Sequence, residues 1–257
     1  MMTRKHLGSA AVLLLAVAVV PLAFGGATSP ESEYYELRIY TFSDAAQVKV
    51  VEDYWEHAAI PALNRLGVDR IGVFNEMESE DTPDVPRLVV LIPYASLDLF
   101  SKVEQKLEAD PEYLKKGAAY YGVEKANPAY TRLESNLLQA MKVPDTGKAR
   151  IFEMREYEGH SEHANNQKMH MFNDAEAACF AASGLTSVFY SKTVIGKNRP
   201  SLFYMVTFDD MDDHAKDWDS FRENPWWAEI RTDKKYEGGG LSGRSTYMLK
   251  PTTFSQI

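Results

Sequence analysis

Two short segments of this 257-residue chain repeat a pattern of glutamate, arginine and tyrosine at alternate positions: Glu36, Arg38 and Tyr40, then Glu153, Arg155 and Tyr157. Because a β-strand alternates its faces with a period of two, the three polar side chains of each segment share one face. An arginine in such a set can hold a carboxylate through two parallel hydrogen bonds. The pattern predicts the wall of a ligand-binding pocket. The alternative is that each Glu–Arg pair only neutralises its own charges in an interface between sheets.

One histidine is a candidate for proton transfer. His57 lies in an expected helix, four residues before Pro61, which lacks the N–H that would bond the carbonyl of His57. A histidine at the resulting kink, beside a cleft, is suited to act as a general base. The alternative is an ordinary surface histidine, since the corresponding residue in the second half of the chain is Asp174.

A second group of histidines follows the second pattern, next to two methionines: His160, His163 and His170. Histidine and methionine in an exported protein are ligands for copper or zinc. Their spacing here matches no established motif, and no cysteine or carboxylate completes the set. We therefore expect a surface helix face and predict no metal and no other cofactor.

Composition excludes several classes of function. The net charge of −9 disfavours binding to nucleic acid and to anionic membrane surfaces. A single cysteine, Cys179, rules out an internal disulfide, and its small apolar neighbours predict a buried side chain rather than a nucleophile. A glycine-rich phosphate loop, a serine nucleophile elbow and a CxxC pair are all missing from the sequence, so it gives no support for a kinase, a dinucleotide enzyme, an α/β-hydrolase or a thioredoxin.

The first 27 residues are typical of a secretory signal peptide. A basic start at residues 4–6 precedes an uncharged aliphatic run from Leu7 to about Phe24, and the small residues 25–27 follow. We expect cleavage near residues 26–27 and export to the periplasm or beyond, with no stable membrane association afterwards. Cleavage would change the net charge from −9 to −11. The alternative is an uncleaved membrane anchor, because the run is long enough to span a bilayer.

The remaining chain is a tandem repeat with about 105 residues per unit. Aligned on the two Glu–Arg–Tyr patterns, the units are 117 residues apart, which pairs Trp55 with Phe172 and Gly67 with Gly184. After a loop of different length the offset becomes 114, and further pairs match: Leu88 with Leu202, Tyr94 with Phe208, Asp98 with Asp212, Pro111 with Pro225, and Tyr113 with Trp227.

Each unit is predicted to have the order β-α-β-β-α-β, which is the ferredoxin-like arrangement. In the first unit (residues 33–142) we expect strands at 34–42, 70–77, 87–94 and 129–141, and helices at 44–66 and 96–108. In the second unit (residues 148–251) we expect strands at 149–158, 185–195, 200–208 and 243–250, and helices at 161–183 and 210–222. A short extra helix should begin at Pro111 and at Pro225, each after an N-capping Asp or Asn.

The sheet of a ferredoxin-like unit carries helices on one face only, so the other face needs a partner. We predict an α+β fold in which two tandem ferredoxin-like (βαββαβ) units face each other as a dimeric α/β-barrel-like pseudo-dimer. If Leu37 and Ile39 pack on the helices, the six Glu, Arg and Tyr side chains line the space between the sheets. Six aromatic residues offer further pocket walls or core packing: Tyr120, Tyr121, Tyr190, Trp218, Trp226 and Trp227.

The chain resembles the NIPSNAP family through its Glu-Leu-Arg-Ile-Tyr opening strand and its Asn224-Pro225-Trp226-Trp227 element, which Asp110-Pro111-Glu112-Tyr113 repeats. The resemblance implies a fold shared with cofactor-independent oxygenases, haem-degrading enzymes and small-molecule isomerases, and it transfers no catalytic residues. Three functions stay open. The first is an exported protein that binds a small molecule between its sheets. The second is a cofactor-free oxygenase or isomerase with His57 as base and Arg38 or Arg155 holding an anion. The third is a non-catalytic assembly module, with a homo-oligomer as its product.

Overall fold

The computed structural model describes residues 33–79, 82–142 and 151–257. The predicted signal peptide lies outside the described residues, as does the segment between the two units. Within the described part of the chain, no helix is both long enough and apolar enough to cross a membrane.

Both units have the predicted order of elements. The first consists of β1 (Tyr34–Thr41), α1 (Ala45–Tyr54), the π-helical turn η1 (Trp55–Ala59), α2 (Ile60–Arg65), β2 (Gly72–Glu76), β3 (Leu88–Tyr94), α3 (Leu97–Glu108), α4 (Pro111–Lys116), α5 (Ala118–Tyr121) and β4 (Arg132–Lys142). The second consists of β5 (Ile151–Gly159), α6 (Glu162–Met171), η2 (Phe172–Glu176), α7 (Ala177–Ala182), β6 (Thr186–Ile195), β7 (Ser201–Phe208), α8 (Met211–Glu223), α9 (Pro225–Ile230), the 3-10 turn η3 (Lys234–Tyr236) and β8 (Leu241–Pro251). The short elements α5 and η3 were not predicted from the sequence.

Side-chain caps begin the helices at matching positions of the two units. Asp44 accepts hydrogen bonds from the backbone N–H groups of residues 46 and 47, and Ser161, which lies 117 residues later, caps α6. Asp110 caps α4, and Asn224, which lies 114 residues later, caps α9, each followed by proline in the first turn. The caps confirm that the sequence repeat is a structural repeat.

The long helix of each unit contains one π-helical turn. Residues 55–59 form this turn in the first unit and residues 172–176 form it in the second. From the sequence, Pro61 predicts a kink at this place. In the second unit Ala178 occupies the corresponding position, yet the turn is present. The π-turn is therefore a feature of the fold rather than a consequence of proline.

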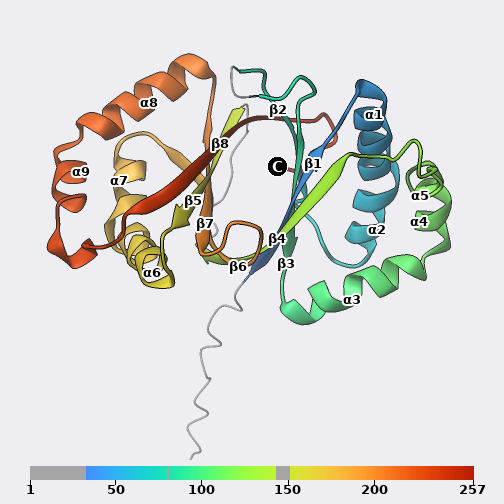
Figure 1. The fold of residues 1–257 in the computed structure, drawn as a ribbon, viewed down its shortest axis with the longest axis horizontal. Coiled ribbons are helices and arrows are strands. Elements are labelled where there is room, and N and C mark those ends of the chain that lie inside the picture. Colours follow the sequence, from blue (N-terminus) through green and yellow to red (C-terminus); the bar gives the residue numbers. More distant parts are fainter. Residues whose placement is uncertain (1–32, 80–81, 143–150) are drawn as a thin grey trace, which may run out of the picture. The chain divides into compact units, whose positions relative to one another are not determined.

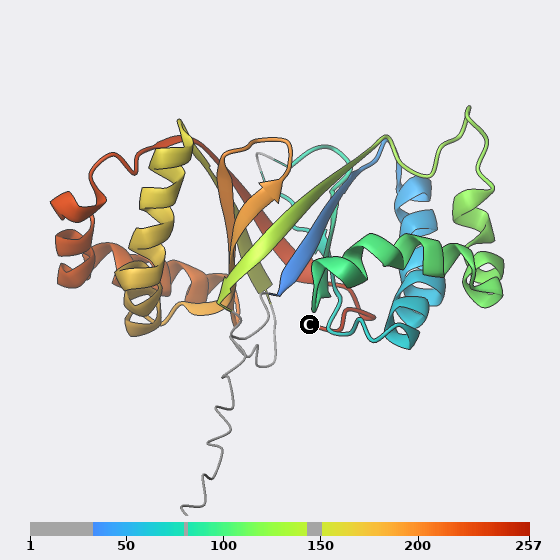
Figure 2. The same ribbon diagram turned by 90° about the horizontal axis from the view of Figure 1, so that it is seen from below.

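The eight strands close into one barrel with the order β1-β3-β2-β8-β5-β7-β6-β4. Each unit contributes a four-stranded antiparallel sheet, and the two sheets join where β2 pairs with β8 and where β4 pairs with β6. Helices α1–α5 cover the outside of the first sheet, and α6–α9 cover the outside of the second on the opposite flank (Figures 1 and 2). The predicted α+β fold, with two ferredoxin-like units in a barrel-like pseudo-dimer, is confirmed.

Apolar side chains fill the barrel interior. Leu37 and Ile39 of β1 point inward and belong to one buried cluster with residues of both units, among them Phe152, Met154 and Phe203. The residues between them on each strand point outward to the helices, where each unit has its own apolar core. A closed barrel excludes water from all sides, so charged side chains inside it would lose their hydration.

Candidate functional site

The structure corrects the expected position of the two Glu–Arg–Tyr patterns. Because Leu37 and Ile39 point into the barrel, the three polar side chains of β1 face the helices of the first unit. The second pattern likewise faces the helices of the second unit, since Phe152 and Met154 point inward. The six residues do not line a common space between the sheets, and that space is packed with apolar side chains. The prediction of a pocket between the sheets is wrong.

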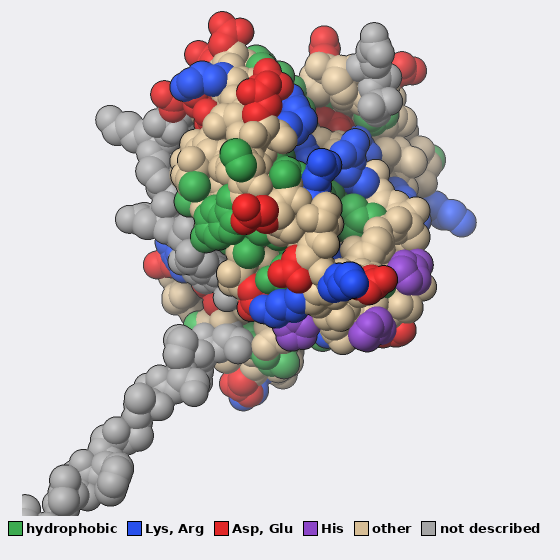
Figure 3. All heavy atoms as spheres, turned by 90° about the vertical axis from the view of Figure 1, so that its left-hand side faces the viewer, with side chains coloured by type: hydrophobic (Ala, Val, Ile, Leu, Met, Phe, Trp, Pro, Cys, Tyr) green, Lys and Arg blue, Asp and Glu red, His purple; other side chains and the backbone are tan. Residues whose placement is uncertain are grey.

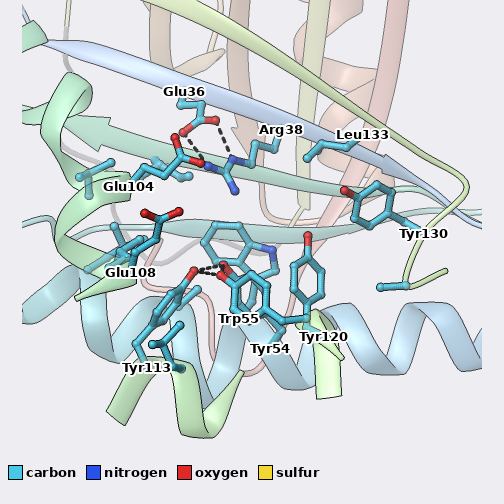
Figure 4. Close-up of a pocket in the computed structure, with 18 of the residues that line it drawn as sticks. Glu36, Arg38, Tyr54, Trp55, Glu104, Glu108, Tyr113, Tyr120, Tyr130 and Leu133 are labelled. Atoms are coloured by element: carbon cyan, nitrogen blue, oxygen red, sulfur yellow. Dashed lines mark hydrogen bonds and ion pairs between the residues drawn. The ribbon is translucent and has the colours of Figure 1, made fainter. Parts of the chain in front are cut away.

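A cavity of about 890 Å³ lies between the sheet and the helices of the first unit. Its size falls within the usual range for small-molecule sites. Side chains from β1, β3, β4, η1 and helices α1–α5 surround it, and Glu36 and Arg38 form a polar part of its wall (Figure 4). Of the first pattern, only Tyr40 is not among the lining residues. It lies fully buried on the same face and packs edge-on against Tyr130, which does line the cavity.

Arg38 and Glu36 form a two-point ion pair on the cavity wall. Arg38 Nε lies 2.7 Å from Glu36 Oε1, and Arg38 Nη2 lies 3.1 Å from Glu36 Oε2. The carboxylate accepts two further hydrogen bonds, from the Ser135 hydroxyl at 2.9 Å and from the Tyr94 hydroxyl at 3.3 Å. Although burial by itself lowers the pKa of Arg38, Glu36 raises it above its ordinary value, so the guanidinium stays charged.

Several N–H donors on the cavity wall have no acceptor among the described residues. A guanidinium has five N–H groups, and Arg38 gives two to Glu36. Among the described residues the other three have no hydrogen-bonding partner. The indole Nε1–H of Trp55, whose ring centroid is 5.7 Å from Arg38 Cζ, is buried and also lacks a partner in the described part of the chain. Buried polar groups are normally paired, so unpaired donors on a cavity wall indicate a place for an acceptor.

Tyrosines form the opposite side of the cavity. Tyr54 and Tyr120 stack with ring centroids 4.0 Å apart and planes 11° from parallel, and the Tyr54 hydroxyl lies 2.7 Å from that of Tyr113. Burial raises the pKa of all three phenols, so they are neutral at physiological pH. Exposed apolar side chains also belong to the lining and form the mouth of the cavity: Leu114, Tyr121 and Val123.

The same pair of residues in the second unit is covered by protein. The Trp218 ring lies over the Arg155 guanidinium, with its centroid 3.8 Å from Cζ, and its N–H donates to Glu153. His214 Nε2 lies 2.9 Å from Glu153 Oε2, the oxygen that also accepts from the Trp218 N–H. Arg155 pairs with Glu153 and donates to the Tyr157 hydroxyl at 3.3 Å. Every residue of the second pattern thus takes part in internal contacts, and these contacts lie on the helix side of the sheet rather than in the interface between the sheets that was expected.

A buried ion pair lies next to this covered site. Lys168 Nζ is 2.7 Å from Glu176 Oε2, and the two side chains are only 10% and 3% exposed. At the corresponding positions, 117 residues earlier, the first unit has Val51 and Ala59. The second unit therefore has two charged groups where the first has two apolar residues, of which Ala59 lines the cavity.

The structure does not bring His57 to the cavity. Its side chain is 58% exposed and lies 3.8 Å from Glu56, and it is not a lining residue. The π-turn directs Trp55 and Ala59 to the cavity instead. The expected role of His57 as a base beside a cleft has no geometric support.

His160, His163 and His170 are exposed on the second unit, and His160 Nδ1 lies 3.2 Å from the carbonyl oxygen of Gly240. Figure 3 shows histidines on the outer surface of this unit beside lysine, arginine and acidic side chains. Within residues 33–79, 82–142 and 151–257, no three His, Cys, Asp or Glu side chains converge as metal ligands would. Cys179 is buried, as predicted, and burial raises the pKa of its thiol.

The sequence predicted some of the cavity residues and not others. Tyr120 and Tyr121 were expected as aromatic walls, and both line the cavity. Glu104 and Glu108 on α3 also line it, but acidic residues on an amphipathic helix normally mark its solvent face. The sequence repeat could have identified Glu104, because the residue 114 positions later is Trp218, a large aromatic residue of the kind that packs against a sheet.

Solved structures share this fold. Two of them, from Fusobacterium nucleatum subsp. nucleatum ATCC 25586 and Lactobacillus acidophilus NCFM, are each described as a "putative monooxygenase". They have 12% and 10% sequence identity with TM-scores of 0.53, covering 86% of this chain and 92% and 94% of theirs. A third, an anthrone oxidase-like protein, has 9% identity and a TM-score of 0.53, covering 86% of this chain and 91% of its own. At such identities the likeness is one of fold only.

No curated protein sequence matches the chain. The NIPSNAP family model matches it twice, over residues 35–141 and 152–256, so the two matches coincide with the two structural units. Together they span most of the chain, and the chain belongs to the NIPSNAP family.

Proposed function

We propose that this protein binds a small organic molecule in the cavity of the first unit, with Arg38 as the group that holds it. The observation that supports this proposal is a guanidinium fixed by a carboxylate on a cavity wall, with three N–H groups that no described residue accepts. Because Glu36 fixes its orientation, Arg38 loses little further freedom when it binds an acceptor.

The test is a thermal-shift screen of the purified protein against small carboxylates, quinones and haem. A ligand at one hundred times its dissociation constant stabilises the folded state by about 2.7 kcal/mol, which raises the unfolding temperature by several degrees. Arg38→Gln should remove the shift, whereas Arg155→Gln, at the matching position of the second unit, should retain it.

A second variant tests the cavity without changing the Arg38–Glu36 ion pair. Leu63 lines the cavity, and the corresponding residue of the second unit is the larger Phe180. Leu63→Phe should fill part of the cavity and weaken binding while Arg38 and Glu36 stay paired. A thermal shift that survives both Arg38→Gln and Leu63→Phe would locate the ligand elsewhere, and a panel without any shift would contradict the proposal.

An oxygenase is the second candidate function. It is favoured by the fold shared with the monooxygenase-type and anthrone oxidase-like structures and by the carboxylates of Glu104 and Glu108 on the cavity wall. In this candidate a wall carboxylate accepts a proton from the substrate, and Arg38 holds the resulting anion. Oxygen uptake with anthrone that is lost in both Glu104→Gln and Arg38→Gln would favour it. Uptake at the uncatalysed rate would exclude this substrate.

A further inference from the structure

In the second unit a tryptophan side chain occupies the place where the first unit has its cavity, and this side chain indicates the kind of group that fits there. In the second unit the indole of Trp218 covers the Arg155 guanidinium at 3.8 Å and is 4% exposed. Trp218 projects from α8, and the residue 114 positions earlier is Glu104 on α3. Both helices begin at caps with the same offset, Ser96 and Asp210, so the two positions are structurally equivalent.

The first unit lacks a ring at this place. Glu104 lines the cavity without an ion pair or hydrogen bond to Arg38 among the described residues, and the Arg38 side chain is 26% exposed, compared with 14% for Arg155. Figure 4 shows Arg38 projecting from β1 toward the open space above Trp55 and Tyr120. The guanidinium plane that Trp218 covers in one unit is therefore accessible in the other.

We infer that the ligand of the first unit is a flat aromatic molecule with an acceptor oxygen, and that its ring lies over the Arg38 guanidinium where Trp218 lies over Arg155. This inference rests on the proposed function and specifies its ligand. Arginine stacks on aromatic faces through its planar, weakly hydrated guanidinium, which favours a ring over a saturated molecule of the same size.

Around Arg38 the wall offers hydrogen-bond donors, so it favours a ligand that carries an acceptor. In the second unit Glu153 accepts from the Trp218 N–H and faces His214. In the first unit Glu36 already accepts two bonds from Arg38, one from Ser135 and one from Tyr94, which uses the capacity of a carboxylate. Among the described residues, Arg38 and Trp55 keep N–H donors without a partner on this part of the wall. A carboxylate, phenolate or quinone oxygen on the ring would accept from them.

The remaining walls fit a flat apolar body. The stacked rings of Tyr54 and Tyr120 present aromatic surface to the cavity, and its mouth is formed by Leu114, Tyr121 and Val123, which are 45%, 49% and 38% exposed. Exposure of these apolar side chains to water is unfavourable, and a bound ring would bury part of their surface. The volume of about 890 Å³ accommodates a bicyclic or tricyclic molecule.

The inference is tested by calorimetric titration of the intact protein with two matched acids, 2-naphthoate and its saturated counterpart decahydro-2-naphthoate. They share the carboxylate and carbon skeleton and differ in planarity and π electrons. We expect 2-naphthoate to bind at least tenfold more tightly, with one site per chain.

Glu104→Trp reproduces the covering residue of the second unit. It should lower the affinity for 2-naphthoate at least a hundredfold without lowering the unfolding temperature. Gln105→Trp places the same residue next to it on α3, at a position that does not line the cavity, and should bind like the natural protein.

The outcomes separate the inference from the proposed function. If both acids bind equally and Glu104→Trp abolishes both, the aromatic class is wrong while the cavity remains the binding site. If neither acid binds, or if Glu104→Trp binds as well as the natural protein, the inference is overturned. The proposed function is overturned as well if the thermal-shift panel gives no hit, or if its shifts survive both Arg38→Gln and Leu63→Phe.

Discussion

The two halves of this barrel place the same ion pair on the same strand and use it differently. In the first unit Glu36 and Arg38 form the wall of a cavity, whereas in the second Glu153 and Arg155 are covered by Trp218. The strand pattern is thus not sufficient to make a site. The decisive residues lie on the helices, where Leu63 and Glu104 of the first unit correspond to the larger Phe180 and Trp218 of the second.

We expect the helix-side residues of the second unit to contribute to stability and those of the first unit to contribute to binding. The second unit stacks Trp218 on Arg155, pairs His214 with Glu153 and buries the Lys168–Glu176 pair. The first unit leaves equivalent space unfilled, and unfilled space costs packing energy. Substitutions that exchange residues between the units should therefore change stability in the second unit and binding in the first.

The largest expected effect is that of Lys168→Val, which introduces the residue of the first unit. It leaves the Glu176 carboxylate buried without its partner, a change that costs about 3–5 kcal/mol of unfolding free energy. Urea denaturation measures the loss. The double variant Lys168→Val/Glu176→Ala should recover most of it, because both charges are then gone as in the first unit.

The same variant has a defined pH dependence. Burial raises the pKa of Glu176, and Lys168 opposes that rise. Without Lys168 the carboxyl group should protonate more readily in the folded protein than in the unfolded chain. The loss of stability relative to the natural protein should therefore shrink as the pH falls. A loss that is the same at pH 8 and pH 5 would contradict this assignment.

Trp218→Phe should have the next largest effect. The phenyl ring can still cover Arg155, but Glu153 loses the indole N–H, and a hydrogen bond to a charged group is worth about 1.5–3 kcal/mol. The loss is measured by urea denaturation against Trp226→Phe, since Trp226 is 40% exposed. Equal losses in the two variants would show that the bond to Glu153 contributes nothing.

His214→Phe, which again introduces the residue of the first unit, should reduce acid sensitivity. Burial raises the pKa of Glu153, but His214 and Arg155 together lower it below its ordinary value of 4.5. Glu153 therefore stabilises the fold above pH 4.5, and this contribution disappears as the pH falls through its folded-state pKa. Denaturation at a series of pH values should show that the unfolding free energy of His214→Phe falls less steeply with decreasing pH than that of the natural protein. An unchanged slope would exclude His214 as a cause.

The smallest effect is expected for Tyr94→Phe in the first unit. The Tyr94 hydroxyl donates to Glu36 over 3.3 Å, and the corresponding residue of the second unit is already Phe208. The loss should be about 0.5–1 kcal/mol of unfolding free energy. Ser135→Ala removes the shorter 2.9 Å bond to the same carboxylate and should cost more. The reverse order would indicate that Tyr94 is the principal support of Glu36.

The sequence by itself determined the architecture. The offsets of 117 and 114 residues, the helix caps at Asp110 and Asn224, and the two strand patterns predicted two ferredoxin-like units that close a barrel, and the structure has them. These features are local or repeat along the chain, so they do not depend on knowing the packing. The burial of Cys179 followed in the same way from its apolar neighbours.

Only the tertiary structure decided where the site lies. The period of two shows that Glu36 and Arg38 share a face opposite Leu37 and Ile39, but it cannot say which face points into the barrel. Closure decides this, because a space shielded from water on all sides must be filled by the apolar set. The cavity then depends on the volumes of side chains on separate helices, such as Leu63 and Glu104 against Phe180 and Trp218, and these residues meet only after the chain has folded.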